Sequence, residues 1–470
     1  DTDMALDTAA GTIGFSDVDI TVAGVDVKAE IEPFAYSGEL QPVVSFAADA
    51  FSLKSLMQAL AIEPLETADP DALGKVMLSG TARMTPQAIT VNDLELVIDD
   101  TTFSGQVSQA QDAAGTITID LTGDSIDLGR YMAPAADSSG GGSGEAVPVE
   151  IPAALIQALN LRGRVALQSA VLSGIEFENP SLGLDARGGA LRMHPISAGL
   201  FGGSYEGDVR IDASGAKPVL SVNERVRDVN LGALARAMFE KENVTGSING
   251  TFTLTGQGAD LSQVQRTLRG TMSFELLDGT YEGKDVWYEL RRARALLKKE
   301  EPPEPQLPAR TQFSTVKLTG PVRDGVFTND DLLAELPFMQ LTGKGSVNLV
   351  AGEVDYHLSA RVFEKPEFAG GMTEEEYDYM RSAIGQRDAL RVIARGKRHD
   401  TGLRLLRREL AEEVIRTADF ERTGHLQALR LDEHRSAGNL VDRVVPYQRG
   451  PDGNAVKPRC SRFDITNIDH

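Results

Sequence analysis

The sequence predicts a mainly β protein with short α-helices, in which many short strands each have one polar and one apolar side. Two observations carry this prediction. Apolar and polar residues alternate with a period of two in several segments, which is typical of half-buried antiparallel strands. The chain of 470 residues also contains 46 glycines, which favours short strands joined by tight turns. A composition of 41% hydrophobic and 25% charged residues indicates a folded chain.

The alternating segments place their apolar residues on one side of each predicted strand. Five segments show this pattern, near residues 94–98, 117–121, 252–254, 272–276 and 354–362. Successive side chains of a strand point to opposite faces, so residues two apart share a face. Eight apolar residues are placed by this spacing on the apolar side of their strands: Leu94, Leu96, Ile98, Ile117, Ile119, Phe252, Leu254 and Phe274.

Glycines predict where the chain reverses between these strands. Asp-Gly pairs stand at 278–279 and 324–325, and further glycines stand at 246, 250, 256, 258 and 270. Such residues accept the positive φ of tight turns, and we therefore expect reversals at all of them.

Short helices are expected where the alternation stops. Three segments, 51–57, 126–132 and 229–235, share an L-x-x-[LY] pattern with apolar residues three apart, and each ends an extended run. They form an irregular repeat. Longer helical patterns predict helices at 152–159, 286–297 and 373–384, the last with a Thr-Glu-Glu-Glu capping signal.

Composition divides the chain into four regions. Residues 1–132 form a first β block, 133–150 a Gly/Ser-rich linker, and 151–396 a second β-rich domain. From 397 to 470 the strand alternation is absent. Residues 403–415 have the pattern of a basic amphipathic helix. Residues 391–470 hold 16 basic and 12 acidic residues, a net of +4 in a chain whose total is −22. We interpret 397–470 as either a divergent tail or a reading-frame artefact, and we favour the artefact.

Charge and cysteine content exclude several classes of protein. A net charge of −22 disfavours nucleic-acid binding and broad contact with anionic lipid headgroups. The single cysteine, Cys460, allows no internal disulfide. No run of 18 apolar residues is present and no signal-like segment opens the chain. We therefore expect that a targeting segment has been removed or that the sequence is an internal fragment.

No constellation of catalytic or metal-ligating residues is visible. His194 is expected in a turn and His357 on the polar side of a strand, and neither has a local partner for nucleophilic catalysis. The acidic pairs at 99–100 and 330–331 lack the order of a calcium loop and are expected in solvated turns at strand ends. The sequence thus predicts a protein that is not an enzyme and has no metal and no cofactor.

Several stretches, taken together, resemble the AsmA family of bacterial envelope proteins. They are 189–207, with its run GLFGGSYEG, then 245–283, which leads into the helix at 286–297, and 311–349. In the first block, 51–59, 73–100 and 124–132 are also similar to that family. The resemblance covers roughly residues 40–396, and the order and spacing of the motifs carry it.

The resemblance implies a periplasmic protein, anchored to the inner membrane by an N-terminal segment that is missing here. It also implies a link to outer-membrane assembly components. The family is similar to the bridge-like lipid transporters, in which an elongated, curved, taco-like antiparallel sheet holds phospholipid acyl chains in a groove.

The eight apolar residues are accordingly predicted to face lipid. Exposing an acyl chain costs about 0.8 kcal/mol per CH₂, so a chain of about 16 carbons costs on the order of 13 kcal/mol in water. A continuous apolar face would remove most of that cost without a catalytic residue. Two alternatives stay open: the same side chains form an ordinary core, or the protein is a structural factor for outer-membrane protein assembly.

Overall fold

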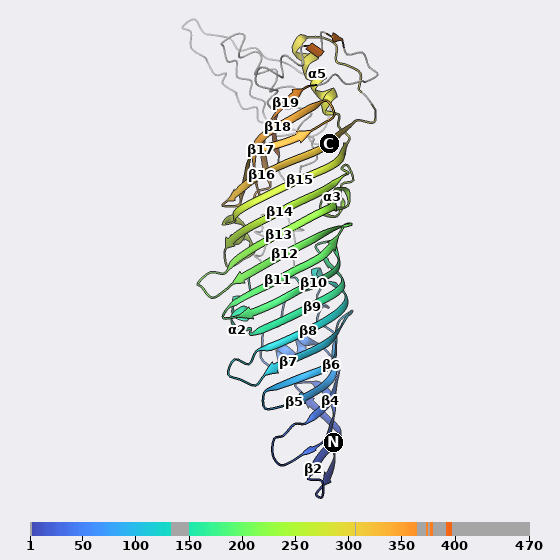
Figure 1. Ribbon diagram of the computed structural model, residues 1–470, viewed down its shortest axis with the longest axis vertical. Helices are drawn as coiled ribbons and strands as arrows, with labels where there is room; N and C mark the ends of the chain where they lie inside the picture. Colours follow the sequence, from blue (N-terminus) through green and yellow to red (C-terminus); the bar gives the residue numbers. More distant parts are fainter. Residues whose placement is uncertain are drawn as a thin grey trace, which may run out of the picture. The chain divides into compact units, whose positions relative to one another are not determined.

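The described part of the chain forms one open, curved β-sheet with a few short helices (Figure 1). The computed structural model describes residues 2–132, 150–305 and 307–363, together with 373–374, 377–378 and 392–396. All of them lie in the first of two compact units, residues 1–419. The mainly β prediction is confirmed.

The strands follow one another across the sheet in chain order. The first run is β1 (Asp3–Asp7), β2 (Thr12–Val22), β3 (Val25–Ala35), β4 (Val43–Phe51), β5 (Val76–Met84), β6 (Ala88–Ile98), β7 (Thr101–Ala110) and β8 (Ile117–Asp127). The second run is β9 (Leu161–Leu172), β10 (Ile175–Arg187), β11 (Ala190–Leu200), β12 (Gly203–Asp212), β13 (Val219–Asn230), β14 (Ser247–Gln257), β15 (Arg269–Glu282), β16 (Arg310–Arg323), β17 (Val326–Glu335), β18 (Met339–Asn348), β19 (Glu353–Val362) and β20 (Val392–Gly396).

The two runs are joined by a parallel pair of strands. Every other neighbouring pair along the described sheet is antiparallel, as expected, but β8 and β9 run parallel, with Ile117 opposite Leu161 and Asp127 opposite Val171. A parallel neighbour requires the chain to cross back to the other end of the strand. The connection between β8 and β9 does this, and it contains the linker predicted at 133–150, of which 133–149 lie outside the described residues.

Short helices stand at the two rims where strands end. They are α1 (Leu53–Ala59), η1 (Leu128–Tyr131), α2 (Ala153–Ala158), α3 (Leu231–Phe239), α4 (Leu261–Arg266) and α5 (Val286–Lys298). The expectations at 152–159 and 286–297 are confirmed by α2 and α5. The helix expected at 373–384 lies mostly outside the described residues, and so do 397–470 with the pattern at 403–415.

The three L-x-x-[LY] segments form α1, η1 and α3, and all three lie on the same rim. They follow β4, β8 and β13, which run in the same direction across the sheet. The residue before each helix, Ser52, Asp127 or Asn230, accepts a hydrogen bond from a backbone N–H of the first turn. Helix α5 follows β15 at the same edge. We call this edge of the sheet the helical rim.

Several glycines expected in turns lie inside strands instead. Gly325 does sit in the turn between β16 and β17, but Gly279 is a buried residue within β15. A Cβ on Gly279 would collide with the ring of Phe313 and lie 2.5 Å from the carbonyl oxygen of Thr245. Gly250, Gly256 and Gly270 also lie within β14 or β15. In strands, glycine marks bulges and close approach as well as reversal, which explains the error.

No helix among the described residues is both long enough and apolar enough to cross a lipid bilayer.

Candidate functional site

One face of the sheet carries apolar side chains from strand to strand. Cross-strand partners in register share a face, so the pairing can be followed across the sheet. One such row crosses β6 to β16: Leu94, Gly105, Leu121, Val165, Leu182, Ile196, Gly207, Glu224, Phe252, Met272 and Gly320. We call the face that contains this row the apolar face and the opposite one the polar face.

The structure brings all eight predicted residues onto the apolar face. Leu96 opposes Phe103, Ile119 opposes Val107 and Phe274 opposes Leu318. Ile98, Ile117 and Leu254 lie two residues from members of these rows on the same strands. Leu94 is 6% exposed, and the other seven are half-buried. Leu94 is thus buried, whereas the other seven side chains are neither sealed in a core nor free in solvent, and contact with lipid stays a prediction.

The apolar face continues through β1–β5. Met4 opposes Phe15, which opposes Ile31, and Val44 and Ala82 continue that row. Exposure is greatest at this end of the described sheet. Met4 and Leu6 on β1 and Ile20 and Val22 on β2 are large exposed side chains, with Met4 61% and Val22 57% exposed.

Aromatic contacts indicate that the apolar face is the concave side of the curved sheet. Phe274 on β15 and Phe327 on β17 lie on either side of β16, on strands whose axes are about 9.6 Å apart at ordinary strand spacing. Their ring centroids are only 6.4 Å apart. Phe177 on β10 and Tyr205 on β12 are likewise two strands apart and have centroids 5.7 Å apart. Side chains on this face therefore converge.

Glycines on the apolar face make room for this convergence. A Cβ on Gly123 of β8 would lie 2.7 Å from Leu167 of β9 and 2.9 Å from Phe103 of β7. On β18, a Cβ on Gly343 would meet Leu358 and Leu332 from its two neighbouring strands. In both places side chains from the flanking strands close over a glycine, as expected on the inside of a curved sheet.

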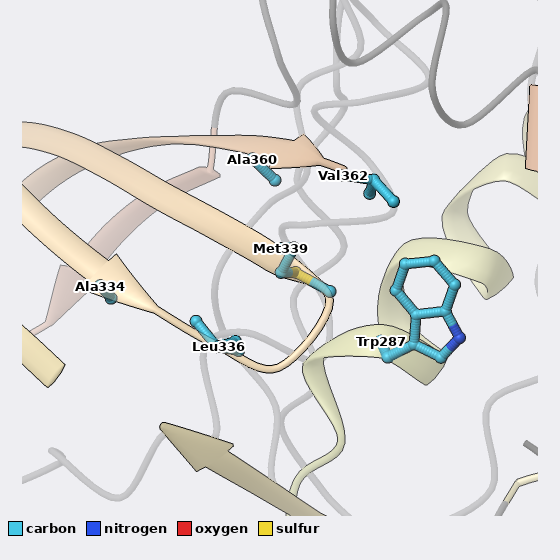
Figure 2. Packing of buried hydrophobic residues seen from close by; sticks show 6 residues of the cluster. All are labelled: Trp287, Ala334, Leu336, Met339, Ala360 and Val362. Carbon is cyan, nitrogen blue, oxygen red and sulfur yellow. The ribbon is translucent and has the colours of Figure 1, made fainter. Parts of the chain in front are cut away.

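Near β16–β19 the apolar face is covered by α5. Trp287 of α5 packs with Ala334, Leu336, Met339, Ala360 and Val362, all buried (Figure 2). Val316 and Leu341, from the same face of β16 and β18, pack against this cluster. At this end the residues form an ordinary hydrophobic core, as the alternative interpretation expected.

The polar face carries ion pairs between neighbouring strands. Arg192 contacts Asp208 at 2.6 Å, Arg227 contacts Glu206 at 3.2 Å and Lys317 contacts Glu275 at 2.8 Å. His194 lies here, within β11 rather than in a turn, and its Nδ1 is 3.5 Å from Asp208. His357 lies in β19 opposite Lys344, in a strand as expected.

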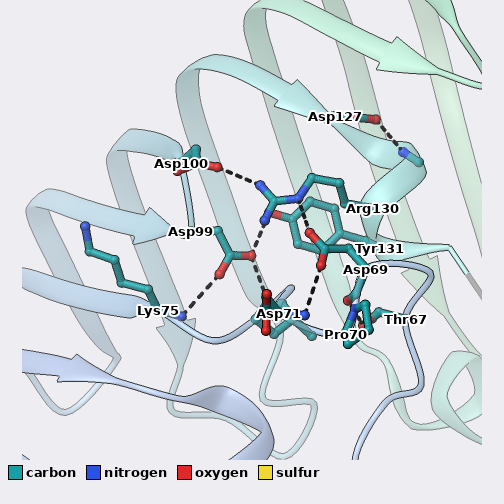
Figure 3. Close-up of polar contacts among 12 residues, drawn as sticks. Thr67, Asp69, Pro70, Asp71, Lys75, Asp99, Asp100, Asp127, Arg130 and Tyr131 are labelled. Atoms are coloured by element: carbon teal, nitrogen blue, oxygen red, sulfur yellow. Dashed lines mark hydrogen bonds and ion pairs between the residues drawn. The ribbon is translucent and has the colours of Figure 1, made fainter.

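A polar cluster on the helical rim joins η1 and the loop before β5 to the turn between β6 and β7 (Figure 3). The carboxylate of Asp99 accepts hydrogen bonds from the N–H groups of Leu73 and Lys75, at 2.7 and 3.2 Å, and from the Tyr131 hydroxyl at 3.0 Å. Arg130 contacts both Asp69 and Asp100 at 2.7 Å. The expectation of a solvated turn at 99–100 is therefore wrong for Asp99, which is 8% exposed.

The surroundings of Asp99 change the pKa values in this cluster. Burial acts to raise the pKa of Asp99, but the hydrogen bonds from Leu73, Lys75 and Tyr131 outweigh it and hold the pKa below its ordinary value. Burial and the bond to Asp99 raise the pKa of Tyr131 to about 12. Both shifts keep Asp99 ionised and Tyr131 protonated at neutral pH, which suits a structural fastening.

The other acidic pair, Asp330 and Asp331, lies within β17 and not at a strand end. Asp331 accepts a hydrogen bond from the Thr319 N–H at 2.8 Å and another from the amide of Asn329. Within the described ranges, no group of three His, Cys, Asp or Glu side chains is placed to hold a metal ion.

Sequence reasoning missed one feature of the apolar face, the carboxyl group of Glu224. The alternation of Val222, Glu224 and Val226 contained the signal, because an acidic residue occupies a position that the pattern reserves for an apolar one.

The comparison with known proteins reaches the second run of strands. Residues 152–332, from α2 into β17, match the AsmA family. This stretch is an AsmA-family region. It contains Glu224, Phe252, Leu254 and Phe274, and it lies inside the range of about 40–396 that the resemblance had indicated. The first run, β1–β8, lies outside the matched residues and extends the same sheet.

Protein AsmA of Escherichia coli (strain K12) is 22% identical to this chain over 208 residues, which are 44% of this chain and 32% of that protein. The match thus spans about a third of the length of that relative. No solved structure matches the chain.

Proposed function

We infer that this protein works in the bacterial cell envelope and shields or transfers phospholipid acyl chains along the apolar face of its sheet. The observation that carries this proposal is the continuity of the face. The register connects apolar positions from β1 to β19 on the concave side of an open sheet, and most of these side chains are half-buried.

The chemistry of the two faces supports the proposal. Transfer of an acyl chain from water to an apolar surface recovers about 0.8 kcal/mol per CH₂. Cross-strand hydrogen bonds satisfy the backbone groups, so the surface can be apolar without unpaired polar backbone atoms. The ion pairs of the polar face keep the other side of the sheet in water.

The similarity to the AsmA family extends the proposal to a location. We propose a periplasmic protein that is anchored to the inner membrane in its full-length form and takes part in outer-membrane biogenesis. Phospholipid acyl chains are its proposed ligands, and outer-membrane assembly components are its proposed partners.

Photo-crosslinking tests the proposal directly. Crosslinking residues at Leu96, Ile119 and Phe274 on the apolar face are expected to capture phospholipid. The same residues at Glu95, Asp120 and Glu275, one position away on the polar face, serve as matched controls. Absence of lipid at all three apolar positions, or equal capture on both faces, would contradict the proposal.

A second candidate is a structural factor for outer-membrane protein assembly. The exposed apolar side chains of β1 and β2 favour it, with Met4 61% and Val22 57% exposed. An exposed apolar patch of this kind can contact another protein. Recovery of an assembly component by pulldown, without co-purifying phospholipid, would favour this function over lipid transfer.

Neither function requires catalysis, and we propose that the protein is not an enzyme. His194 and His357 both lie on the polar face. Replacing both with asparagine is expected to leave lipid capture and cell-envelope integrity unchanged. Loss of either property in a folded double variant would reopen an enzymatic role.

A further inference from the structure

Glu224 is the charged side chain on the apolar face of β11–β15, strands that the structure describes in full. The register places only apolar residues, glycine or Tyr205 at the other positions of this face, from Leu191 on β11 to Leu276 on β15. Glu224 opposes Gly207 on β12 and Phe252 on β14. It therefore interrupts the apolar row at mid-strand, away from both rims.

The contacts of Glu224 come from its own strand and the two flanking strands. Val222 and Val226 share its face on β13, and Phe252 faces it from β14. From β12, the Tyr205 side chain extends over Gly207, where a Cβ would lie 2.8 Å from the Tyr205 hydroxyl. That hydroxyl forms a hydrogen bond with the Glu224 carboxyl. Tyr205 is the one titratable group among these neighbours, and none of them carries a positive charge.

This environment favours the neutral carboxylic acid. Burial raises the pKa of Glu224, and the hydrogen bond from Tyr205 offsets only part of that effect. Burial and the negative charge of Glu224 raise the pKa of Tyr205, so the phenol stays protonated. Glu224 is half-buried, so a ligand lying on the apolar face would remove the remaining water from it.

We propose that Glu224 couples the binding of hydrocarbon on the apolar face to the uptake of a proton. This inference rests on the proposed function, because it concerns ligands of the same face. A carboxylate covered by an alkyl chain loses its hydration, whereas the neutral acid keeps its hydrogen bond to Tyr205 and loses little.

Linkage gives the direction of the effect. Binding that favours the protonated acid raises the pKa of Glu224 further in the complex. Affinity for hydrocarbon is then full below the pKa of the free protein. It falls as pH rises through that value, by at most about tenfold per pH unit for one proton, and levels off above the pKa of the complex.

The test uses the full chain and an uncharged probe, a diacylglycerol with a fluorescent acyl chain, titrated between pH 5 and 8. Wild type is expected to bind the probe roughly fivefold or more weakly at pH 8 than at pH 5. Glu224→Gln is expected to bind equally tightly at every pH, and more tightly than wild type at pH 8. Glu95→Gln, on the polar face of β6, is the control and should keep the wild-type profile.

A second variant shifts the profile instead of abolishing it. Tyr205→Phe removes the hydrogen bond that lowers the pKa of Glu224, so the loss of affinity should move to higher pH. This shift tests the inference even if Glu224→Gln fails to fold.

The outcomes separate this inference from the proposed function. Binding by wild type that does not change between pH 5 and 8, or a pH profile that survives in Glu224→Gln, would overturn the proton coupling and leave lipid binding intact. Absence of probe binding at every pH would overturn both.

Discussion

At the scale of single residues, the polar cluster of the helical rim shows how much depends on one carboxylate. Asp99 accepts three hydrogen bonds, two of them from backbone N–H groups that have no strand partner at that point. Its neighbour Asp100 is 88% exposed and contributes one contact with Arg130. Adjacent and chemically identical side chains therefore have different energetic roles.

Asp99→Ala is expected to lower the free energy of unfolding by about 2–4 kcal/mol, because it leaves buried donors without an acceptor. Asp100→Ala is expected to cost less than about 1 kcal/mol, since exposed ion pairs contribute little. Chemical denaturation of both variants and wild type measures the difference. Equal losses would show that Asp99 does not fasten the rim.

The same residue predicts a pH dependence. The pKa of Asp99 is lower in the folded protein than in the unfolded chain, so its contribution is present above the unfolded pKa of about 3.9 and is lost as pH falls below it. Wild type should therefore lose more stability than Asp99→Asn when pH is lowered from about 5 to 3. A parallel loss in both proteins would contradict this assignment.

Gly279 tests whether glycine inside a strand marks close approach. Gly279→Ala would place a Cβ against the Phe313 ring and 2.5 Å from the Thr245 carbonyl oxygen, and it is expected to destabilise the fold by about 1–3 kcal/mol. Gly215→Ala is the control, because its nearest neighbour would lie 3.9 Å away. Thermal unfolding distinguishes them, and a neutral Gly279→Ala would refute the explanation.

At the scale of elements, α5 converts one end of the apolar face into a closed core. Trp287 of α5 is buried against residues of β17–β19. The helix was predictable from its 3.6-residue pattern, but its position over the sheet was not, because the pattern shows that a helix has an apolar side and not what that side covers.

Trp287→Ala is expected to lower the free energy of unfolding by about 3–5 kcal/mol, as large-to-small changes in a core do. It should also increase the binding of a hydrophobic dye, because the apolar face at β16–β19 loses its cover. Leu155→Ala, on the exposed side of α2, should change stability by less than about 0.5 kcal/mol. No gain in dye binding by a folded Trp287→Ala protein would show that α5 is not a cover.

Strands β6, β8, β14, β15 and β19 were predictable from alternation, and the rows that connect them were not. Leu94, Leu96 and Ile98 share a face within one strand, as their spacing requires. Leu94, Val165 and Phe252 lie in one cross-strand row because of the register between strands, and bulges and turns determine that register. Glycines misled the prediction at 278–279, and the burial of Asp99 was missed because sequence does not show which side chains a rim will bury. Glu224 was missed although its place in the alternation with Val222 and Val226 marked it.

At the scale of the described sheet, the apolar face is continuous, concave and unequal along its length. It is most exposed at β1 and β2, half-buried through the middle strands, and covered by α5 at β16–β19. The parallel pair β8–β9 keeps this face continuous across the change of run, because Leu121 opposes Val165 there. An AsmA-family region and the run that precedes it thus share one surface.

Native mass spectrometry on matched variants at the centre of this surface tests the central claim most directly. Wild type purified from cells is expected to carry phospholipid. Leu182→Arg, which places a charge on the apolar face, should lose that lipid, while Ser181→Arg, one residue away on the polar face, should retain it. Wild-type protein without bound lipid, or equal lipid content in both folded variants, would contradict the account.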